Sequence, residues 1–249
     1  MLREAVEWLA TSSLSFARRS GHLSEFVAIA ARRRRHRVAW APHEERSKAA
    51  VLRAADRAET SGIAVILGAG HLNDVPLRAL SERFATIRLV DVAFAPATRR
   101  VARTLGNVTC VRHDVTESLP DLAEITAPSF LRDDADVRFV ASVNLLSQLA
   151  VVATRQMDDV RADAVGRALI EAHLAWLRRL PCPAALVFDR SIEILGPSGT
   201  VISRLDPLKG AELPEPDETW IWDIAPRGEI DVDHSVRHIV AAIDDLTCA

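Results

Sequence analysis

The chain of 249 residues has few cysteines and no long hydrophobic segment. Cys110, Cys182 and Cys248 are odd in number, widely spaced and without a CxxC pair, so neither a disulfide framework nor a zinc knuckle is expected. No apolar run approaches the roughly 20 residues of a transmembrane helix. Charges among the first seven residues leave no apolar core for a signal peptide. We therefore expect a cytoplasmic protein that does not bind membranes.

Metal-binding patterns are also missing, because no i, i+4 pair among the eight histidines encloses the carboxylate that such a metal site needs. The net charge of −3 is spread unevenly, with 12 Lys/Arg against 7 Asp/Glu in residues 1–60. This basic excess centres on RRRRHR at 32–37. We interpret Arg32 to Arg35 as a solvated helix end at the negative pole of the helix dipole. RNA binding is the alternative, but no aromatic residues interleave with the run, so nucleic acid is not expected as a partner.

Two regions differ in their hydrophobic periodicity. Residues 1–60 have helical spacing and predict an N-terminal helical cap, in which Pro42 opens a helix over about 43–59. Residues 61–249 alternate strand and helix patterns and predict a Rossmann-like domain. The expected strands are 63–67, 87–92, 108–114, 137–142, 184–189, 219–225 and 236–243, and the expected helices are 74–84, 96–105 and 157–180.

This alternation predicts an α/β fold with a doubly wound, mostly parallel, seven-stranded sheet. The last two strands have no helix between them, so we expect the C-terminal strand to be antiparallel. A helix over 236–243 is the alternative. Residues 195–218 are rich in Gly and Pro and are interpreted as an irregular loop near the site.

The stretch VILGAGHLNDVPL, residues 65–77, contains a glycine loop between a strand and a helix. Gly68 and Gly70 allow a sharp turn and a close approach of a ligand, and Asn73 or Asp74 would cap the next helix. This is the edge of the sheet at which open α/β folds bind ligands. A plain tight turn is the alternative interpretation.

Two aspartates end the next two strands. Asp91 lies 21 residues beyond Gly70, where a carboxylate can accept both hydroxyls of an adenosine ribose. Asp114 lies where a carboxylate can accept from an adenine amino group. A dinucleotide pattern requires a third glycine, but Asn73 occupies that place, and Asp74 would repel a pyrophosphate. A cofactor without phosphates is therefore expected.

The order LGAG, LVDV and VRHDV resembles class I S-adenosylmethionine-dependent methyltransferases over about residues 60–245. The resemblance implies methyl transfer from S-adenosylmethionine, with the methionine part at Gly68 and Gly70, the ribose on Asp91 and the adenine beside Val92. Ser142 and Asn144 would face the sulfonium and the substrate. The expected cofactor-binding residues are Leu67, Gly68, Ala69, Gly70, Asp91, Val92, Asp114, Val115, Ser142 and Asn144.

The chain departs from this family at two positions. Ile66 stands where the family often has an acidic residue, and Leu72 stands where it has its third glycine. Both lie in the methionine half of the implied pocket. A non-catalytic adenosine-binding protein and an NAD-dependent oxidoreductase are therefore alternative functions.

No catalytic residue is visible in the sequence, because the cofactor supplies the reactive carbon and the protein mainly orients the acceptor. The Asn-Pro-Pro-aromatic motif of enzymes that methylate amino groups of bases is absent after 137–142. We expect a small-molecule acceptor, with His43, Arg46 and His71 as candidate substrate residues. Cys182 lies before a strand and is not expected to be a nucleophile. The oligomeric state is left open.

Overall fold

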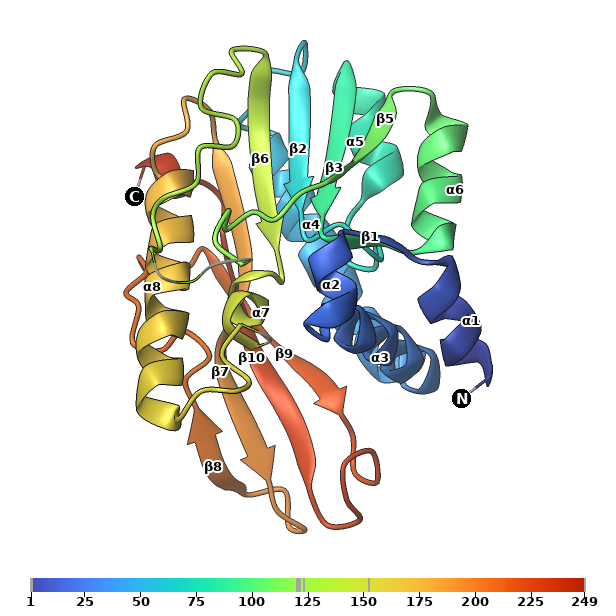
Figure 1. The fold of residues 1–249 in the computed structure, drawn as a ribbon, viewed down its shortest axis with the longest axis vertical. Helices are drawn as coiled ribbons and strands as arrows, with labels where there is room; N and C mark the ends of the chain where they lie inside the picture. The colour runs from blue at the N-terminus through green and yellow to red at the C-terminus, as the bar shows by residue number, and fades with distance from the viewer. Residues whose placement is uncertain (1, 120–121, 123, 152, 249) are drawn as a thin grey trace.

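The computed structural model describes residues 2–119, 122, 124–151 and 153–248. Its main sheet has the strand order β5-β3-β2-β6-β7-β10-β9, with β8 paired to β7 outside this row (Figure 1). The strands are β2 (Ile63–Leu67), β3 (Thr86–Asp91), β5 (Val108–Arg112), β6 (Val137–Val143), β7 (Ala184–Leu195), β8 (Val201–Leu205), β9 (Glu218–Ala225) and β10 (Ser235–Ile243).

The direction of the strands confirms the predicted mostly parallel sheet. β2 pairs in parallel with β3 and β6, β3 with β5, and β6 with β7. β10 is antiparallel to both β7 and β9, so the tail is strand, as predicted, and not helix. The chain order reverses between β2 and β6, which is the switch point of a doubly wound Rossmann-like fold.

The eighth strand corrects the prediction for residues 195–218. β7 continues to Leu195, and the chain turns at Gly199, whose φ is +79°, into β8. β7 and β8 then pair from Ile192 to Leu195 and form a hairpin that extends beyond the sheet (Figure 1). The β-branched residues in SIEIL and VISRL favour these two strands. None of the residues 195–218 that the structure describes lines the main pocket.

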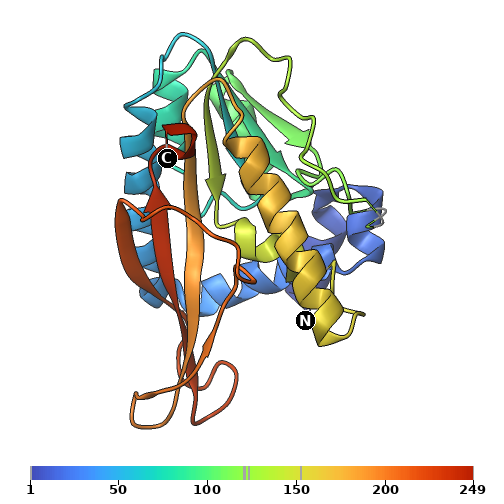
Figure 2. The ribbon, with the colours of Figure 1, turned by 90° about the vertical axis from the view of Figure 1, so that its left-hand side faces the viewer.

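Helices cover both faces of the sheet and make a three-layer core (Figure 2). One face packs against α4 (Arg37–Ala55), α5 (Leu77–Arg83) and α6 (Pro96–Leu105). The other packs against α7 (Leu146–Val151), which sequence periodicity did not reveal, and α8 (Asp159–Leu177). A short 3-10 helix, Leu246–Cys248, is the last element of the described chain. Among the described residues no helix has the length and apolar character to span a membrane.

The predicted start of the third N-terminal helix is wrong. α4 begins at Arg37, and Pro42 lies inside it. Its first turn is fixed by Trp40, which is buried and donates its indole N–H to the carbonyl oxygen of Ile224 at 3.1 Å. This tertiary contact holds the helix in place on the N-terminal side of the proline.

The other N-terminal helices are α1 (Leu2–Ala10), α2 (Ser15–Arg19) and α3 (His22–Arg35), with the short strand β1 (Ser12–Ser13) paired to β4 (Ala93–Phe94). α2 and α3 lie across the carboxyl ends of β2 and β3 (Figure 1). α4, in contrast, shares its core with the sheet. A domain boundary at residue 60 stays a prediction, and the helices that cover the sheet edge are α2 and α3.

The arginine run forms the last turn of α3, as predicted, but its guanidinium groups are paired with carboxylates. Arg32 and Arg35 bind Glu229 in the loop between β9 and β10, Arg33 binds both oxygens of Glu44, and Arg34 binds Glu7. We call the contacts of Glu229 with Arg32, Arg35 and His36 the Glu229 clamp. The arginine run therefore attaches α3 to α1, to α4 and to the loop between β9 and β10.

Candidate active site

The glycine loop after β2 needs both of its glycines. Gly68 has φ +78°, and a Cβ there would lie 2.5 Å from the carbonyl oxygen of Val143. A Cβ on Gly70 would lie 2.7 Å from the Ala93 carbonyl oxygen and would also meet the Phe26 ring. Both glycines line a large pocket at the carboxyl edge of the sheet. Leu67 and Ala69 are buried in the core, and neither lines this pocket.

Leu72 occupies a backbone conformation that favours glycine. Its φ is +58°, in the left-handed region, at the place where the resemblance implies a glycine. The loop therefore follows a backbone path that favours glycine, with leucine at this position. The Leu72 side chain lines the pocket and packs against the core beneath it.

One end of the pocket contains the predicted adenosine-binding residues. Asp91, Val92, Asp114 and Val115 all line it, as does the unpredicted Leu119. Asp91 Oδ2 accepts from the Gly70 N–H at 2.9 Å. Burial raises the pKa of Asp91 to about 6, although N–H groups of the surrounding backbone favour its ionised form.

Asp114 shapes its own loop. Its Oδ1 accepts from the backbone N–H and the hydroxyl of Thr116, at 2.9 and 2.8 Å, and its Oδ2 accepts from the Leu119 N–H at 2.9 Å. These bonds hold the turn that carries Val115 and Leu119 to the pocket. The carboxylate still lines the pocket, so it meets a ligand with its internal bonds already made.

The two residues predicted after β6 point to opposite sides. Ser142 is fully buried, pairs its hydroxyl with His173 Nε2 at 3.1 Å on the α8 side, and does not line the pocket. Its predicted place near the sulfonium is therefore wrong, because it faces the core within the strand. Asn144, just beyond the strand, has φ +49° and turns into the pocket.

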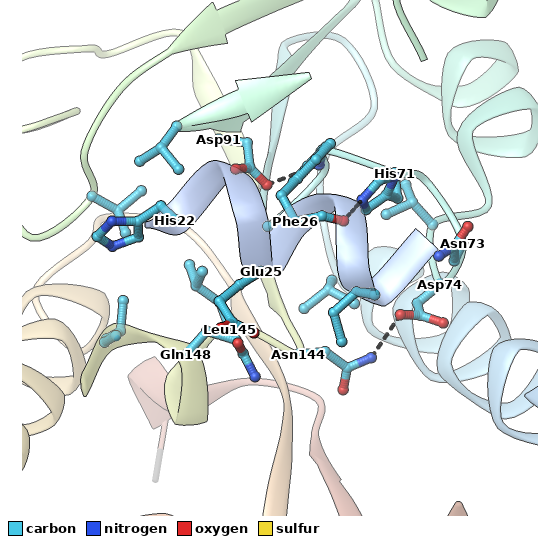
Figure 3. A pocket seen from close by; sticks show the side chains of 18 of the residues that line it. His22, Glu25, Phe26, His71, Asn73, Asp74, Asp91, Asn144, Leu145 and Gln148 are labelled. Atoms are coloured by element: carbon cyan, nitrogen blue, oxygen red, sulfur yellow. Dashed lines mark hydrogen bonds between the residues drawn. The ribbon is translucent and has the colours of Figure 1, made fainter. Parts of the chain in front are cut away.

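A buried polar network lies behind Asn144. Asn144 Nδ2 donates to Asp74 Oδ2 at 2.8 Å and lies 3.2 Å from His43 Nε2 (Figure 3). His43 Nδ1 accepts from the Trp220 indole N–H at 3.1 Å, and the His43 ring stacks on Trp222 at 3.9 Å. Asn144 Oδ1 is buried without a hydrogen-bond partner in the described structure. This unused acceptor is a place where a ligand N–H or O–H can bind.

Asp74 is part of this network and not a helix cap. The N-cap position of α5 is Pro76, and no side chain caps it. Burial opposes ionisation of Asp74, but hydrogen bonds from His43 and Asn144 hold its pKa below the ordinary value. Asp74 therefore presents a negative charge at the pocket wall.

The candidate substrate residues fall in three different places. His71 lines the pocket, stacks on Phe26 with 3.7 Å between ring centroids, and has a pKa lowered by burial. His43 lies beneath the lining and supports Asp74 and Asn144. Arg46 is exposed and binds Glu218 at 3.0 Å, so the structure places it outside the pocket.

The roof of the pocket comes from one face of α3, which the sequence interpretation had not connected with the site. His22, Glu25, Phe26 and Ile29 line it at i, i+3, i+4 and i+7 spacing (Figure 3). The regular spacing of these polar and apolar residues on one helix face was the sequence signal by which they could have been assigned to the site. Glu25 also pairs with Arg155, which fixes the first turn of α3.

The far end of the pocket is aromatic and contains an acid–histidine pair. Trp40, Trp222 and Ile224 line it together with Asp189 and His238. Asp189 Oδ1 lies 2.9 Å from His238 Nδ1, and Asp189 Oδ2 accepts from the Ser147 hydroxyl at 2.6 Å. This pair joins residues 49 positions apart, which the sequence alone did not connect.

The described part of the chain contains no metal-binding cluster, and Cys182 is not an activated thiol. No group of three or more His, Cys, Asp or Glu side chains could hold a metal ion there. Cys182 is buried, and burial raises the pKa of its thiol to about 11, so it is not an activated nucleophile.

No protein-family model matches the chain, and no curated protein matches it. Among solved structures it is similar to a DhpI–SAM–HEP complex, with 13% identity over 87% of this chain and 95% of that one and a TM-score of 0.38. It is also similar to Burkholderia thailandensis 1,6-didemethyltoxoflavin-N1-methyltransferase with bound 1,6-didemethyltoxoflavin and S-adenosylhomocysteine (15% identity, 88% and 89% coverage, TM-score 0.33). A third is an O-methyltransferase family protein from the same species (14% identity, 96% and 67% coverage, TM-score 0.36). The bound molecules belong to those proteins, and the assignment for this chain rests on its own pocket.

Proposed function

We propose that the protein transfers a methyl group from S-adenosylmethionine to a small-molecule acceptor. The observation that carries the proposal is one continuous pocket that joins Asp91 at one end to an aromatic chamber at the other. An adenosine group fits beside Asp91, Val92 and Val115, and an acceptor fits beside Trp222 and Ile224. Asn144 lies between them.

The residues present fit this cofactor. Asp91 would accept from the ribose hydroxyls, for which an ionised carboxylate retains unused lone pairs after bonding to Gly70 and Ala93. The unpartnered Asn144 Oδ1 and the carboxylate of Asp74 would receive the ammonium group of the methionine part. Asp74 would supply the negative charge that Ile66 does not.

When bound, S-adenosylmethionine supplies an electrophilic methyl group on a sulfonium. The protein's own task is to orient the acceptor and to exclude water. The α3 roof, with Phe26 above Gly70, encloses the cofactor end. The Trp40 and Trp222 rings, 4.8 Å apart at 83°, form an apolar wall at the acceptor end.

The alternative functions fit the pocket less well. A dinucleotide requires room for a pyrophosphate at the glycine loop, but this part of the wall carries Leu72 and the ionised Asp74. RNA binding would need free arginines, but the described arginines of the run are bound to carboxylates. A non-catalytic adenosine-binding protein would use the same adenosine end and differs only in turnover.

Calorimetric titration with S-adenosylhomocysteine, S-adenosylmethionine and NAD, each alone, tests the proposal. We expect the first two to bind and NAD not to bind. Asp91→Ala should weaken binding at least tenfold, because a charged hydrogen bond contributes about 1.5–3 kcal/mol. Asp223→Ala, an exposed aspartate on β9, is the matched control and should bind normally. Binding of NAD alone would replace the proposal by an oxidoreductase.

A further inference from the structure

Asp189 and His238 form a buried dyad, although neither was a candidate residue in the sequence. Their side chains are 3% and 10% exposed, and both line the acceptor end of the pocket. They come from neighbouring antiparallel strands, β7 and β10. The His238 ring also lies edge-on against Trp222, with 5.4 Å between ring centroids, so its orientation is fixed from two sides.

The hydrogen bonds define which ring nitrogen of His238 is available. Burial by itself would raise the pKa of Asp189, but the hydrogen bonds from His238 and from the Ser147 hydroxyl hold it below its ordinary value. An ionised Asp189 can only accept, so the proton of the neutral His238 ring lies on Nδ1. Nε2 then carries a lone pair, and no described residue forms a hydrogen bond with it.

We propose that His238 Nε2 is the general base of this enzyme and that the methyl acceptor is a hydroxyl group on a small aromatic or apolar molecule. The inference rests on the proposed function and names its substrate class. A neutral amine already has a nucleophilic lone pair, whereas a hydroxyl reacts poorly until its proton is removed. A base oriented by a carboxylate therefore favours an oxygen acceptor, and Trp222 and Ile224 favour an apolar one.

The proposed step is balanced. The acceptor oxygen forms a bond to the methyl carbon while the bond from sulfur to that carbon breaks, and its electron pair returns to sulfur. The hydroxyl proton passes to His238 Nε2, and the imidazolium is stabilised by Asp189 at 2.9 Å from Nδ1. The proton then leaves to solvent, which restores the neutral His238 ring beside the ionised Asp189.

A second pair in the same chain offers a matched control. His234 Nδ1 lies 2.8 Å from Asp231 Oδ2, so this pair has the same chemistry, but it is exposed in the loop before β10. It does not line the pocket. A substitution of His234 changes an Asp–His pair without changing the site.

The first test uses ring-labelled ¹⁵N histidine spectra of the protein saturated with S-adenosylhomocysteine. We expect His238 to be protonated at Nδ1 and not at Nε2, and Asp189→Asn to give a mixture of tautomers. Titrated phenol should shift the Nε2 signal, whereas toluene, which lacks the hydroxyl, should not. A proton on Nε2, or an Nε2 signal that does not respond to phenol, overturns the proposal.

The second test uses His238→Asn, whose amide nitrogen can still donate to Asp189 while no group replaces Nε2. With S-adenosylmethionine and phenol or catechol we expect kcat to fall by about 10²–10⁴, the usual contribution of a general base, with KM within a few fold. Aniline should be methylated more slowly than phenol by the unchanged protein. His234→Asn should leave the rates unchanged.

The outcomes separate this inference from the proposed function. If the unchanged protein does not bind S-adenosylhomocysteine, the proposed function fails, and the base assignment fails with it. If the cofactor binds, and His238→Asn retains full activity or aniline is the preferred acceptor, only the base assignment fails. Equal affinity of His238→Asn and the unchanged protein for S-adenosylhomocysteine shows that the variant is folded.

Discussion

The carboxylate of Asp91 accepts a hydrogen bond from the backbone N–H of Gly70 at 2.9 Å. The ends of β2 and β3 are therefore tied together at the point where the adenosine is expected. The same carboxylate is buried, and burial raises its pKa to about 6. Protonation of Asp91 near neutral pH can therefore be followed by measuring the affinity for a ligand.

Binding of S-adenosylhomocysteine should weaken in acid. Ribose hydroxyls donate to the ionised form of Asp91, so protonation of this group in the free protein, with a pKa of about 6, competes with the ligand. At pH 5 the affinity should be about tenfold below that at pH 7, because one pKa unit corresponds to a tenfold change. Below pH 6, calorimetry in buffers of different ionisation enthalpy should show proton release on binding.

Asp91→Asn provides the control for this pH dependence. It cannot be ionised, so its lower affinity should not change between pH 5 and pH 7. The folding stability of the protein without ligand should change with pH in the opposite direction. A carboxyl pKa that is raised from 3.8 to about 6 on folding contributes stability that is lost as the pH rises through this range. If the affinity of Asp91→Asn changed with pH as much as that of the unchanged protein, another group would be responsible for the pH dependence of binding.

Leu72→Gly should be more stable than Leu72→Ala, in reverse of the usual order. Both variants lose the packing of the leucine, but only glycine relieves the left-handed conformation at φ +58°. This conformation costs an L-residue roughly 1–2 kcal/mol. Chemical denaturation of the two variants measures the difference directly. A less stable glycine variant would mean that the loop relaxes when the side chain is shortened.

The stability of the protein should fall in acid through His173. Burial lowers the pKa of this histidine to about 4, whereas the unfolded chain titrates near 6.5. Stability is fully present above pH 6.5 and is lost as the pH falls toward 4. The loss should be about 2 kcal/mol between pH 7 and pH 5, because the unfolded state alone takes up the proton.

His173→Gln should flatten this slope in thermal unfolding measured at several pH values. Its amide can still pair with the Ser142 hydroxyl. His234→Gln, at an exposed histidine, should keep the slope of the unchanged protein. A steep slope in His173→Gln would assign the acid sensitivity to other groups.

Glu229→Gln should loosen the α3 roof. Arg35, with His36 and Arg32, lowers the pKa of Glu229 to about 2, so the stability that the ionised Glu229 carboxylate contributes is fully present above pH 4.5 and is lost only as the pH falls through about 2. Without this charge we expect hydrogen exchange of the α3 amides to quicken by up to about fivefold, because a partly exposed ion pair contributes at most about 1 kcal/mol. Glu215→Gln, which removes one exposed pair with Arg190, should have no such effect.

The sheet and the glycine loop were predictable from sequence because their signals are local. Buried apolar runs marked the parallel strands, and Gly68, Gly70 and Asp91 were found where the strands end. Ser142 was misplaced, because sequence does not show at which residue β6 ends and hence which side chain turns away from the core. The turn begins at Asn144, one residue beyond the strand.

The parts of the site that were missed depend on contacts between distant segments. Phe26 lies above Gly70 only because α3 crosses the sheet edge. Asp189 meets His238 only because β7 extends past β6 and pairs there with β10. Hydrophobic periodicity reports which face of an element is buried, and it does not report which element covers it.

The Glu229 clamp also sets an order of assembly. The roof helix lies within the first 35 residues, and the group that holds its end lies 194 residues beyond Arg35. On the ribosome the roof is made first, but it can be fastened only after β9 has emerged, and the dyad is complete only when β10 follows. A nascent chain therefore lacks the complete pocket until β10 has been made.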